Sequence, residues 1–372
     1  MILILSNREL NPQGTGVDTF QPCLKVEGSD KVVLAEASLD PNNHWDISLI
    51  PSLPVPVQDW EASPQCQTLF KSLINSMTNE INSSNQAGTQ IRKNDDGSYY
   101  WAILVPGYNS NPQESLQRAR ELEVLYQVNV ILFSWPANPK ESNFPDPKLP
   151  YKTAELAAYF TSIKLASSLR QLNSLFIAPA RNKVRDALGT VRFKVSLLAH
   201  SLGNRTLYYL MRSNNHSGAT ENEDLQAFDA VILHQADVDL DKSQAWIPQI
   251  KAARVFITTN FNDGILRISD IINKTRLGTI VKGKDLQDMQ NLDTIDFTHA
   301  HYVGKAHWLF SESKDQTADP WFQQTIKPFP NERVKFQCAQ MLKGEKIKVA
   351  NGETDFFFNS ESYKFEYKSG TL

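Results

Sequence analysis

The sequence has few of the residues that mark disulfide scaffolds, zinc sites or nucleic-acid binding. Its 372 residues include only three cysteines. Because these are far apart and odd in number, they predict neither a disulfide framework nor a zinc site. The 38 Lys and Arg residues are outnumbered by 41 Asp and Glu residues, for a net charge of −3. No basic stripe interleaved with aromatic residues is present, which argues against nucleic-acid binding as the main activity.

Long hydrophobic runs are also missing. No apolar run approaches the roughly 20 residues that a membrane-spanning helix needs. The N-terminal sequence MILILSNREL has five leading apolar residues and no basic segment before them, which favours a first strand over a signal peptide. We therefore expect a cytoplasmic protein without a transmembrane segment.

What is present is an alternation of strand-like and helical patterns between residues 96 and 317. With 41% hydrophobic and 21% charged residues, the chain suits one large globular domain with additions, or two domains. The alternation predicts βαβ units and a mostly parallel sheet whose active-site loops follow the strands' carboxyl ends. Strands are expected at 100–106, 128–135, 193–199, 228–237, 253–260 and 292–298, and helices at 112–127, 151–178, 241–251 and 264–273.

The two ends of the chain fall outside this alternation. Residues 1–95 suggest strands and one helix, over 62–83, packed on the core. Residues 318–372 contain VKFQC, KIKVA, DFFFN and YKFEYK, which alternate as antiparallel strands do and predict a β-rich extension. Residues 138–150 hold four prolines and predict a surface loop above the sheet.

The most informative stretch is FKVSLLAHSLGNRTLYYLMR, residues 193–212. An apolar strand ends at Ala199, Ser201 stands in the turn, and a helical pattern starts after Gly203. This context is typical of a nucleophile elbow, a strained turn that exposes a reactive serine at the top of a sheet. The alternative is an ordinary βα turn in which Ser201 caps the helix.

A reactive serine needs a histidine base, and the histidine needs an oriented acid. In enzymes built around such an elbow, the acid and then the histidine follow the serine along the chain. Asp263 in FITTNFNDG comes directly after a predicted strand and is the favoured acid. Asp237 and Asp239, after the preceding strand, are its rivals, and each of the three also suits a turn or cap.

The favoured base is His307 in GKAHWLF, within the loops after the last predicted strand of the core. His301 and His299 are alternatives in the same region. His-x-His spacing can also bind zinc, but no cysteine or carboxylate cluster at ligand spacing accompanies it. We therefore expect neither a metal nor a cofactor.

An oxyanion hole needs two backbone N–H groups aimed at the developing negative charge. Leu202, the residue after the candidate nucleophile, is expected to supply one, and Tyr108 in PGYN is expected to supply the other. Asn109, Ser134 and Trp135 are candidates for the pocket, although Trp135 suits core packing equally well. A simple turn is the alternative interpretation of PGYN.

Taken together, these segments resemble the α/β-hydrolase superfamily, and more narrowly a bacterial esterase/lipase-like subfamily of unknown function. The resemblance covers about residues 99–311. It rests on VPGYN, FSWPAN, LLAHSLGN, QADVD, NDGIL, RLG and the late histidine loop. It implies an α/β-hydrolase fold, a triad of Ser201, Asp263 and His307, and oxyanion donors at Tyr108 and Leu202.

The leading hypothesis is a serine hydrolase that cleaves a small-molecule or lipid acyl ester, or a thioester, through an acyl-enzyme on Ser201. One rival is a non-catalytic interaction protein on a hydrolase scaffold, which would bind a protein partner through its terminal extensions. Another is an acyltransferase, which shares the acyl-enzyme step. Fold alone does not decide among them.

Overall fold

The computed structural model places the described residues around one 11-stranded sheet. The described residues are 1–21, 27–29, 31–50, 57–79, 91–138, 148–188, 193–214, 225–280, 286, 289–300, 303–311, 332–348, 356–359 and 364–367. The strands, from one edge to the other, are β10 (Phe356–Asn359), β11 (Lys364–Tyr367), β9 (Leu292–Asp296), β8 (Val255–Thr259), β7 (Ala230–His234), β6 (Phe193–His200), β4 (Tyr99–Val105), β5 (Asn129–Ser134), β1 (Ile2–Ser6), β2 (Val33–Leu39) and β3 (Trp45–Ile50).

The sheet is mostly parallel, as the alternation of strands and helices predicted. Within the described strands, only β1–β2, β2–β3 and β10–β11 pair antiparallel. The chain leaves β4 toward β5 on one side and returns to β6 on the other. This reversal creates a switch point at the carboxyl ends of β4 and β6, where ligands bind in open α/β sheets.

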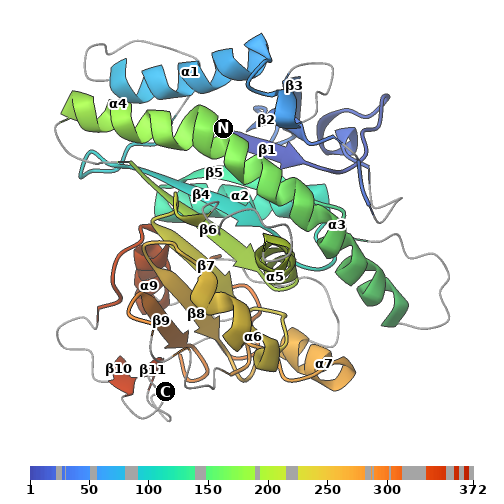
Figure 1. Cartoon of the computed structure of the whole chain (residues 1–372), viewed down its shortest axis with the longest axis vertical. Coiled ribbons are helices and arrows are strands. Elements are labelled where there is room, and N and C mark those ends of the chain that lie inside the picture. Colours follow the sequence, from blue (N-terminus) through green and yellow to red (C-terminus); the bar gives the residue numbers. More distant parts are fainter. Residues whose placement is uncertain are drawn as a thin grey trace.

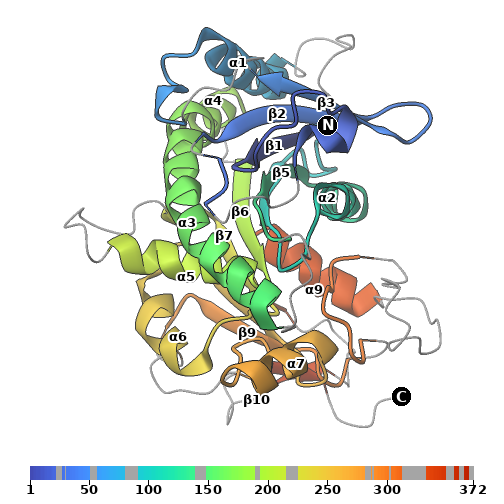
Figure 2. The ribbon, with the colours of Figure 1, turned by 90° about the vertical axis from the view of Figure 1, so that its right-hand side faces the viewer.

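Helices cover both faces of the sheet (Figures 1 and 2). One hydrophobic core joins the sheet to α1, α3, α4, α5 and α6, and a second joins the opposite face to α2 and α9. The helices are α1 (Pro64–Asn79), α2 (Pro112–Tyr126), α3 (Lys148–Leu172), α4 (Ala178–Leu188), α5 (Gly203–Asn214), α6 (Leu240–Trp246), α7 (Gly264–Ile272) and α9 (Glu332–Leu342). Among the described helices, none combines the length and apolar composition needed to cross a bilayer.

The helix expected to stop near Pro179 continues past it. A π-helical turn, Asn173–Ile177, follows α3, and α4 then runs to Leu188. Proline has no N–H to donate to the carbonyl one turn earlier in an α-helix. The wider π turn lies directly before this missing hydrogen bond. Phe176 and Ile177 are fully buried in this turn, so core packing holds the segment helical across the proline.

The two ends of the chain extend the same sheet. At the N-terminal side, β1 pairs in parallel with β5, and Leu3 lies opposite Ile131. At the C-terminal side, β11 pairs in parallel with β9. The strand-rich additions are therefore part of the sheet. The division of the chain into 1–95, 96–317 and 318–372 remains a proposal drawn from the sequence.

Two predicted strands of the C-terminal extension were wrong. In KIKVA, the described residues 346–348 lie in neither a strand nor a helix. VKFQC lies in helix α9, not in a strand. Val334, Cys338 and Met341 are all buried, and their spacing of four and three residues places them on one face of a helix. Over the whole of α9 the buried residues follow helical spacing, and their burial decides the structure against the short β-like pattern. DFFFN and YKFEYK do form the antiparallel pair β10 and β11.

Candidate active site

The loops that carry the predicted site residues follow the carboxyl ends of neighbouring strands. In the register of the sheet, Val105 lies opposite Ala199, and His200 lies opposite His234. His234 in turn lies opposite Thr258. The ends of β4, β6, β7 and β8 therefore meet at one edge, which brings together segments far apart in the sequence.

Ser201 occupies a strained turn between β6 and α5. Its φ of 51° lies in the left-handed region, which costs energy for a residue with a side chain. The turn is held by two backbone bonds: the Ser201 N–H donates to His234 O at 3.0 Å, and the Asp237 N–H donates to Ser201 O at 3.1 Å. A Cβ on Gly203 would lie 2.5 Å from Val105 O, so glycine allows α5 to cross close behind the serine. The strained backbone is the one that the elbow pattern predicted, but Ser201 itself is only 3% exposed, so the expected exposure of the serine is not found in this structure.

The loop after β4 lies against the candidate nucleophile. A Cβ on Gly107 would approach the Ser201 Cβ to 2.7 Å, so only glycine fits there without a shift. The Trp135 indole N–H donates to Pro106 O at 2.9 Å, and the Asn109 N–H donates to Ala137 O at 2.9 Å. These bonds fix the loop that carries Tyr108 beside Ser201.

Asp263 and His307 are joined directly. The His307 Nδ1 lies 2.6 Å from the Asp263 Oδ2. Asp263 is fully buried, whereas the His307 side chain keeps 14% of its surface exposed. A buried carboxylate therefore contacts an imidazole that solvent can reach.

The remaining contacts of Asp263 fix the direction of its carboxylate. Its Oδ1 accepts the backbone N–H groups of Ile265 and Leu266 at 2.9 and 3.0 Å, which caps α7. The Gln235 side chain, with its amide nitrogen turned toward Asp263, donates to Oδ2 at 3.3 Å and to Gly278 O at 3.2 Å. That orientation is the one in which both groups find partners. Each carboxylate oxygen of Asp263 thus accepts from two donors.

The two rival acids belong to a different, buried ionic network. Asp237 accepts from the Tyr151 hydroxyl at 3.0 Å and the Ser269 hydroxyl at 2.7 Å, and it pairs with the Arg276 Nε at 2.9 Å. Asp239 pairs with the same guanidinium. Arg276 is fully buried, so its two carboxylates neutralise a charge that would otherwise be costly to bury. Among the described contacts, neither rival acid touches a histidine, because both carboxylates are taken up by this network.

His200, the neighbour of Ser201, contacts the loop that carries His307. The Arg118 guanidinium lies 3.2 Å from the His200 Nδ1, and the His200 Nε2 lies 2.9 Å from His307 O. Because arginine only donates, Nδ1 is the acceptor and Nε2 carries the proton that bonds His307 O. Burial, followed by the charges of His307 and Arg118, holds the pKa of His200 well below its usual value, so this imidazole is neutral.

His234 holds the same loop two residues later. Its Nε2 accepts the Leu309 N–H at 3.2 Å, and its Nδ1 donates to the Thr258 hydroxyl at 2.7 Å. Burial, followed by the charge of His307, also holds its pKa well below the usual value. Two neutral histidines from adjacent strands therefore fix the backbone on both sides of Trp308.

The His200 and His307 rings also lie close together, with centroids 4.6 Å apart. This contact brings His307 beside the residue that precedes Ser201. No hydrogen bond joins the Ser201 hydroxyl to His307 among the described contacts. His299 is exposed in the turn after β9, and His301 lies outside the described residues.

The predicted pocket residues Ser134 and Trp135 are buried, so their pocket role gains no support. The Ser134 hydroxyl accepts from the Arg8 Nε at 3.0 Å, and another Arg8 nitrogen donates to Ser110 O at 2.8 Å. Ser134 and Trp135 thus brace the loops next to Ser201, Ser134 through Arg8 and Trp135 through Pro106 O. Asn109 adopts a φ of 57° in the Tyr108 loop and is exposed.

Several residues that organise the site were not found from the sequence. Gln235, with a φ of 43°, and Arg118 act through contacts with segments far along the chain. The only local signal was position, since Gln235 directly follows a strand. His200 stands next to Ser201 in the sequence, but its partners Arg118 and His307 O are set by the fold.

The site belongs to a part of the chain that matches a known family. Residues 80–304 match a family model described as "Alpha/beta hydrolase of unknown function (DUF900)". The match contains Ser201 and Asp263, and it ends just before His307. Among curated proteins, none matches the chain. The matched span covers more than half of the sequence and contains β4 through β9, which confirms both the resemblance and the fold class. The chain therefore belongs to this family of alpha/beta hydrolases of unknown function.

Proposed function

We propose that the protein is a serine hydrolase that cleaves a carboxylic ester or thioester, with Ser201 as nucleophile, His307 as base and Asp263 as orienting acid. The observation that carries the proposal is the 2.6 Å contact between His307 and the buried Asp263, in loops that meet beside the strained Ser201 turn. Family membership supports a hydrolase in general, and the residue roles are our assignment.

The contact with Asp263 selects the tautomer in which neutral His307 can act as a base. Its Nδ1 faces a carboxylate that accepts hydrogen bonds only, so Nδ1 carries the proton and Nε2 has a free lone pair. Nε2 is then able to accept the Ser201 proton as Oγ attacks the acyl carbon. Serine–histidine hydrogen bonds are often long in free enzymes and shorten when substrate binds.

The reaction then proceeds in two halves. In the first, Ser201 Oγ bonds to the acyl carbon, and protonated His307 gives its proton to the leaving alcohol or thiol. In the second, His307 takes a proton from water, and the resulting attack releases the acid and restores Ser201. Asp263 stays ionised throughout and stabilises the imidazolium that forms in each half.

The negative charge on the carbonyl oxygen needs donors near Ser201. The Leu202 N–H lies just before α5, at a helix start where N–H groups have no acceptor within the helix. We assign it as one donor and the Tyr108 N–H as the other. The close approach of Gly107 to Ser201 supports this assignment, because Tyr108 directly follows Gly107 and an oxyanion hole needs its donors beside the attacked carbonyl.

The proposal is tested by covalent labelling with a fluorophosphonate probe, which reacts with activated serines. We expect the wild-type protein to be labelled on Ser201 and to hydrolyse a short p-nitrophenyl ester. Ser201→Ala should abolish the labelling and reduce hydrolysis by at least about 10³-fold, as removal of a nucleophile does.

Ser168→Ala is the matched control. Ser168 is also buried, and among the described contacts its hydroxyl donates to Lys164 O one turn back in α3 and to no site residue, so this variant should be labelled as the wild type is. Failure of the wild-type protein to react with the probe, or equal ester hydrolysis by Ser201→Ala, would exclude the proposed role of Ser201.

A further inference from the structure

The outward face of α7 exposes a row of isoleucines to solvent. Ile265, Ile268 and Ile271 are all exposed, and Ile271 keeps 85% of its surface accessible. Leu266 and Ser269, on the opposite side of the helix, are buried. A surface helix normally turns its polar side outward, so α7 presents apolar side chains where charged ones are expected.

Two neighbouring segments extend this row. Phe261, in the turn before α7, is exposed, and so is Leu149 in the first turn of α3. The start of α3 lies beside the end of α7 in both ribbon views (Figures 1 and 2), and the Lys152 ammonium donates to Asn273 Oδ1 at 3.3 Å. We call Leu149, Phe261, Ile265, Ile268 and Ile271 the α7 face.

Two exposed cations lie beside the start of the α7 face. Arg267 is exposed on α7, with its guanidinium 5.9 Å from the centre of the Phe261 ring. Lys305 is exposed beside the start of the helix, where its carbonyl accepts the Gly264 N–H at 3.2 Å. The single carboxylate of α7, Asp270, is half-buried and accepts the Arg276 N–H at 2.8 Å. Among the described residues, Arg267 and Lys305 thus place two exposed cations beside the start of this face, whereas Lys152, near its other end, pairs with Glu155 at 2.8 Å.

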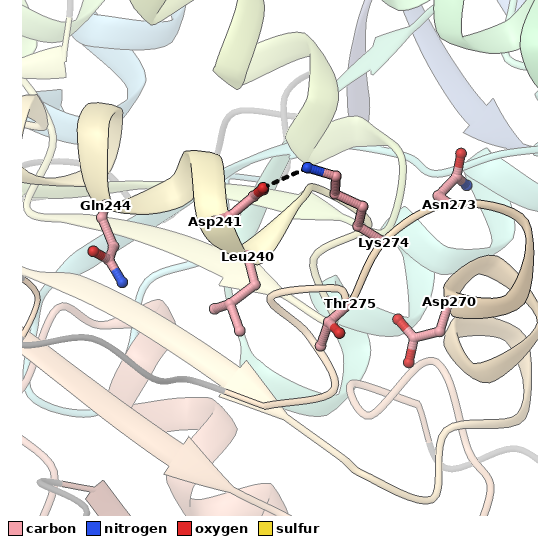
Figure 3. A pocket seen from close by; sticks show the side chains of 7 residues that line it. All are labelled: Leu240, Asp241, Gln244, Asp270, Asn273, Lys274 and Thr275. Atoms are coloured by element: carbon pink, nitrogen blue, oxygen red, sulfur yellow. Dashed lines mark hydrogen bonds and ion pairs between the residues drawn. The ribbon is translucent and has the colours of Figure 1, made fainter.

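A hollow of about 670 Å³ lies between α6 and the segment 270–275 at the end of α7 (Figure 3). Lys274 pairs there with Asp241 at 2.8 Å, so its charge is neutralised locally. The hollow is lined by none of Ser201, Asp263 and His307, which separates it from the candidate active site. Its lining residues are Leu240, Asp241, Gln244, Asp270, Asn273, Lys274 and Thr275.

We infer that the α7 face docks on a lipid surface that carries anionic head groups. Aliphatic and aromatic side chains flanked by Lys and Arg are the composition of segments that lie in the membrane–water interface. Protein interfaces instead concentrate Trp, Tyr and Arg in pockets and are depleted of Lys. The row projects from a helix and forms no groove, which suits insertion between head groups.

The position of the face gives docking a consequence for the site. Asp263 caps the first turn of α7, so a lipid surface against this helix lies next to the loops that carry Asp263 and His307. Docking goes beyond the proposed hydrolysis, because binding to the surface needs neither Ser201 nor His307.

The test is co-sedimentation of full-length Ser201→Ala protein with lipid vesicles, so that hydrolysis cannot alter the lipid. We expect binding to phosphatidylcholine vesicles that contain added phosphatidylglycerol, and weaker binding to phosphatidylcholine alone. Adding Ile268→Ser and Ile271→Ser should lower the partition coefficient at least about tenfold, because two apolar side chains are removed from the interface. Arg267→Ser should reduce binding to the anionic vesicles selectively.

Ile163→Ser in the same background is the matched control. Ile163 on α3 is 53% exposed, close to the 49% of Ile268, and it lies about 21 Å along the helix from Leu149. It should bind as its parent does. Absence of vesicle binding, or equal loss with Ile163→Ser, overturns the inference. So does a result in which the Ile268 and Ile271 changes affect only self-association. The wild-type background with these two changes should still react with the fluorophosphonate probe, which separates failure of docking from failure of the proposed chemistry.

Discussion

At Asp263, one carboxylate performs two structural tasks with its two oxygens. Oδ1 caps α7 through two backbone N–H groups, and Oδ2 contacts His307. The cap fixes the rotamer of the side chain, so the second oxygen is already directed at the imidazole. Asp237 and Asp239 looked similar in the sequence, and they differ because Arg276 takes up both.

Asparagine at position 263 should separate these two tasks. Asn caps helices about as well as Asp, but its amide does not hold the imidazole in the same tautomer or stabilise its positive charge. We expect Asp263→Asn to lower kcat for ester hydrolysis by about 10³- to 10⁴-fold. Asp263→Ala should lose the cap as well, at a further cost of about 1 kcal/mol in the free energy of unfolding.

Ester hydrolysis and urea unfolding of the two variants check this prediction. Parental kcat in Asp263→Asn would show that Asp263 does not orient the base. Equal stability of Asp263→Asn and Asp263→Ala would show instead that the cap is energetically unimportant.

Among the elements, α2 begins directly after the loop that approaches Ser201. Asn111 accepts the Glu114 N–H at 2.9 Å, and the Glu114 carboxylate accepts the Asn111 N–H at 3.4 Å, which forms a capping box. Pro112 at the first turn adds a residue already suited to helix. This start signal is local, and the predicted and observed limits of α2 agree closely. The limits of α3 and α9 were set by burial, so they could not be predicted as well.

Loss of the cap should destabilise α2 and the loop before it. We expect Asn111→Ala to reduce the free energy of unfolding by about 1 kcal/mol, while Asn111→Asp should stay within a few tenths of the wild-type value. Urea denaturation of the three proteins checks this. Equal midpoints for Asn111→Ala and the wild type would show that the Asn111 side chain contributes nothing to the helix start.

For the molecule as a whole, the neutral histidines make stability depend on pH. The pKa values of His200 and His234 are well below the usual 6.5 in the folded protein, whereas unfolding restores ordinary ones. The unfolded chain therefore binds more protons below about pH 6.5, and stability falls as pH decreases from there. Above this range both states are neutral at these positions, and their contribution is constant.

The expected slope is up to about 1.4 kcal/mol per pH unit for each histidine. Replacing His234 with Gln removes one of the two groups, so the dependence on pH should become shallower by up to that amount. Urea unfolding between about pH 5 and 6.5 measures it. A slope that does not change in His234→Gln would show that this histidine is protonated in the folded protein.

The sequence by itself determined the alternating strands and helices, the mostly parallel sheet and the strained Ser201 turn. These depend on the spacing of apolar residues and on turn chemistry, which act within a few residues of the chain. Only the tertiary structure decided that Asp263 contacts His307, that Arg276 takes up the rival acids, and that His200 and His234 fix the loop at 307–309. Such contacts join segments that meet only where parallel strands end together, so their partners are chosen by packing and burial across the whole sheet.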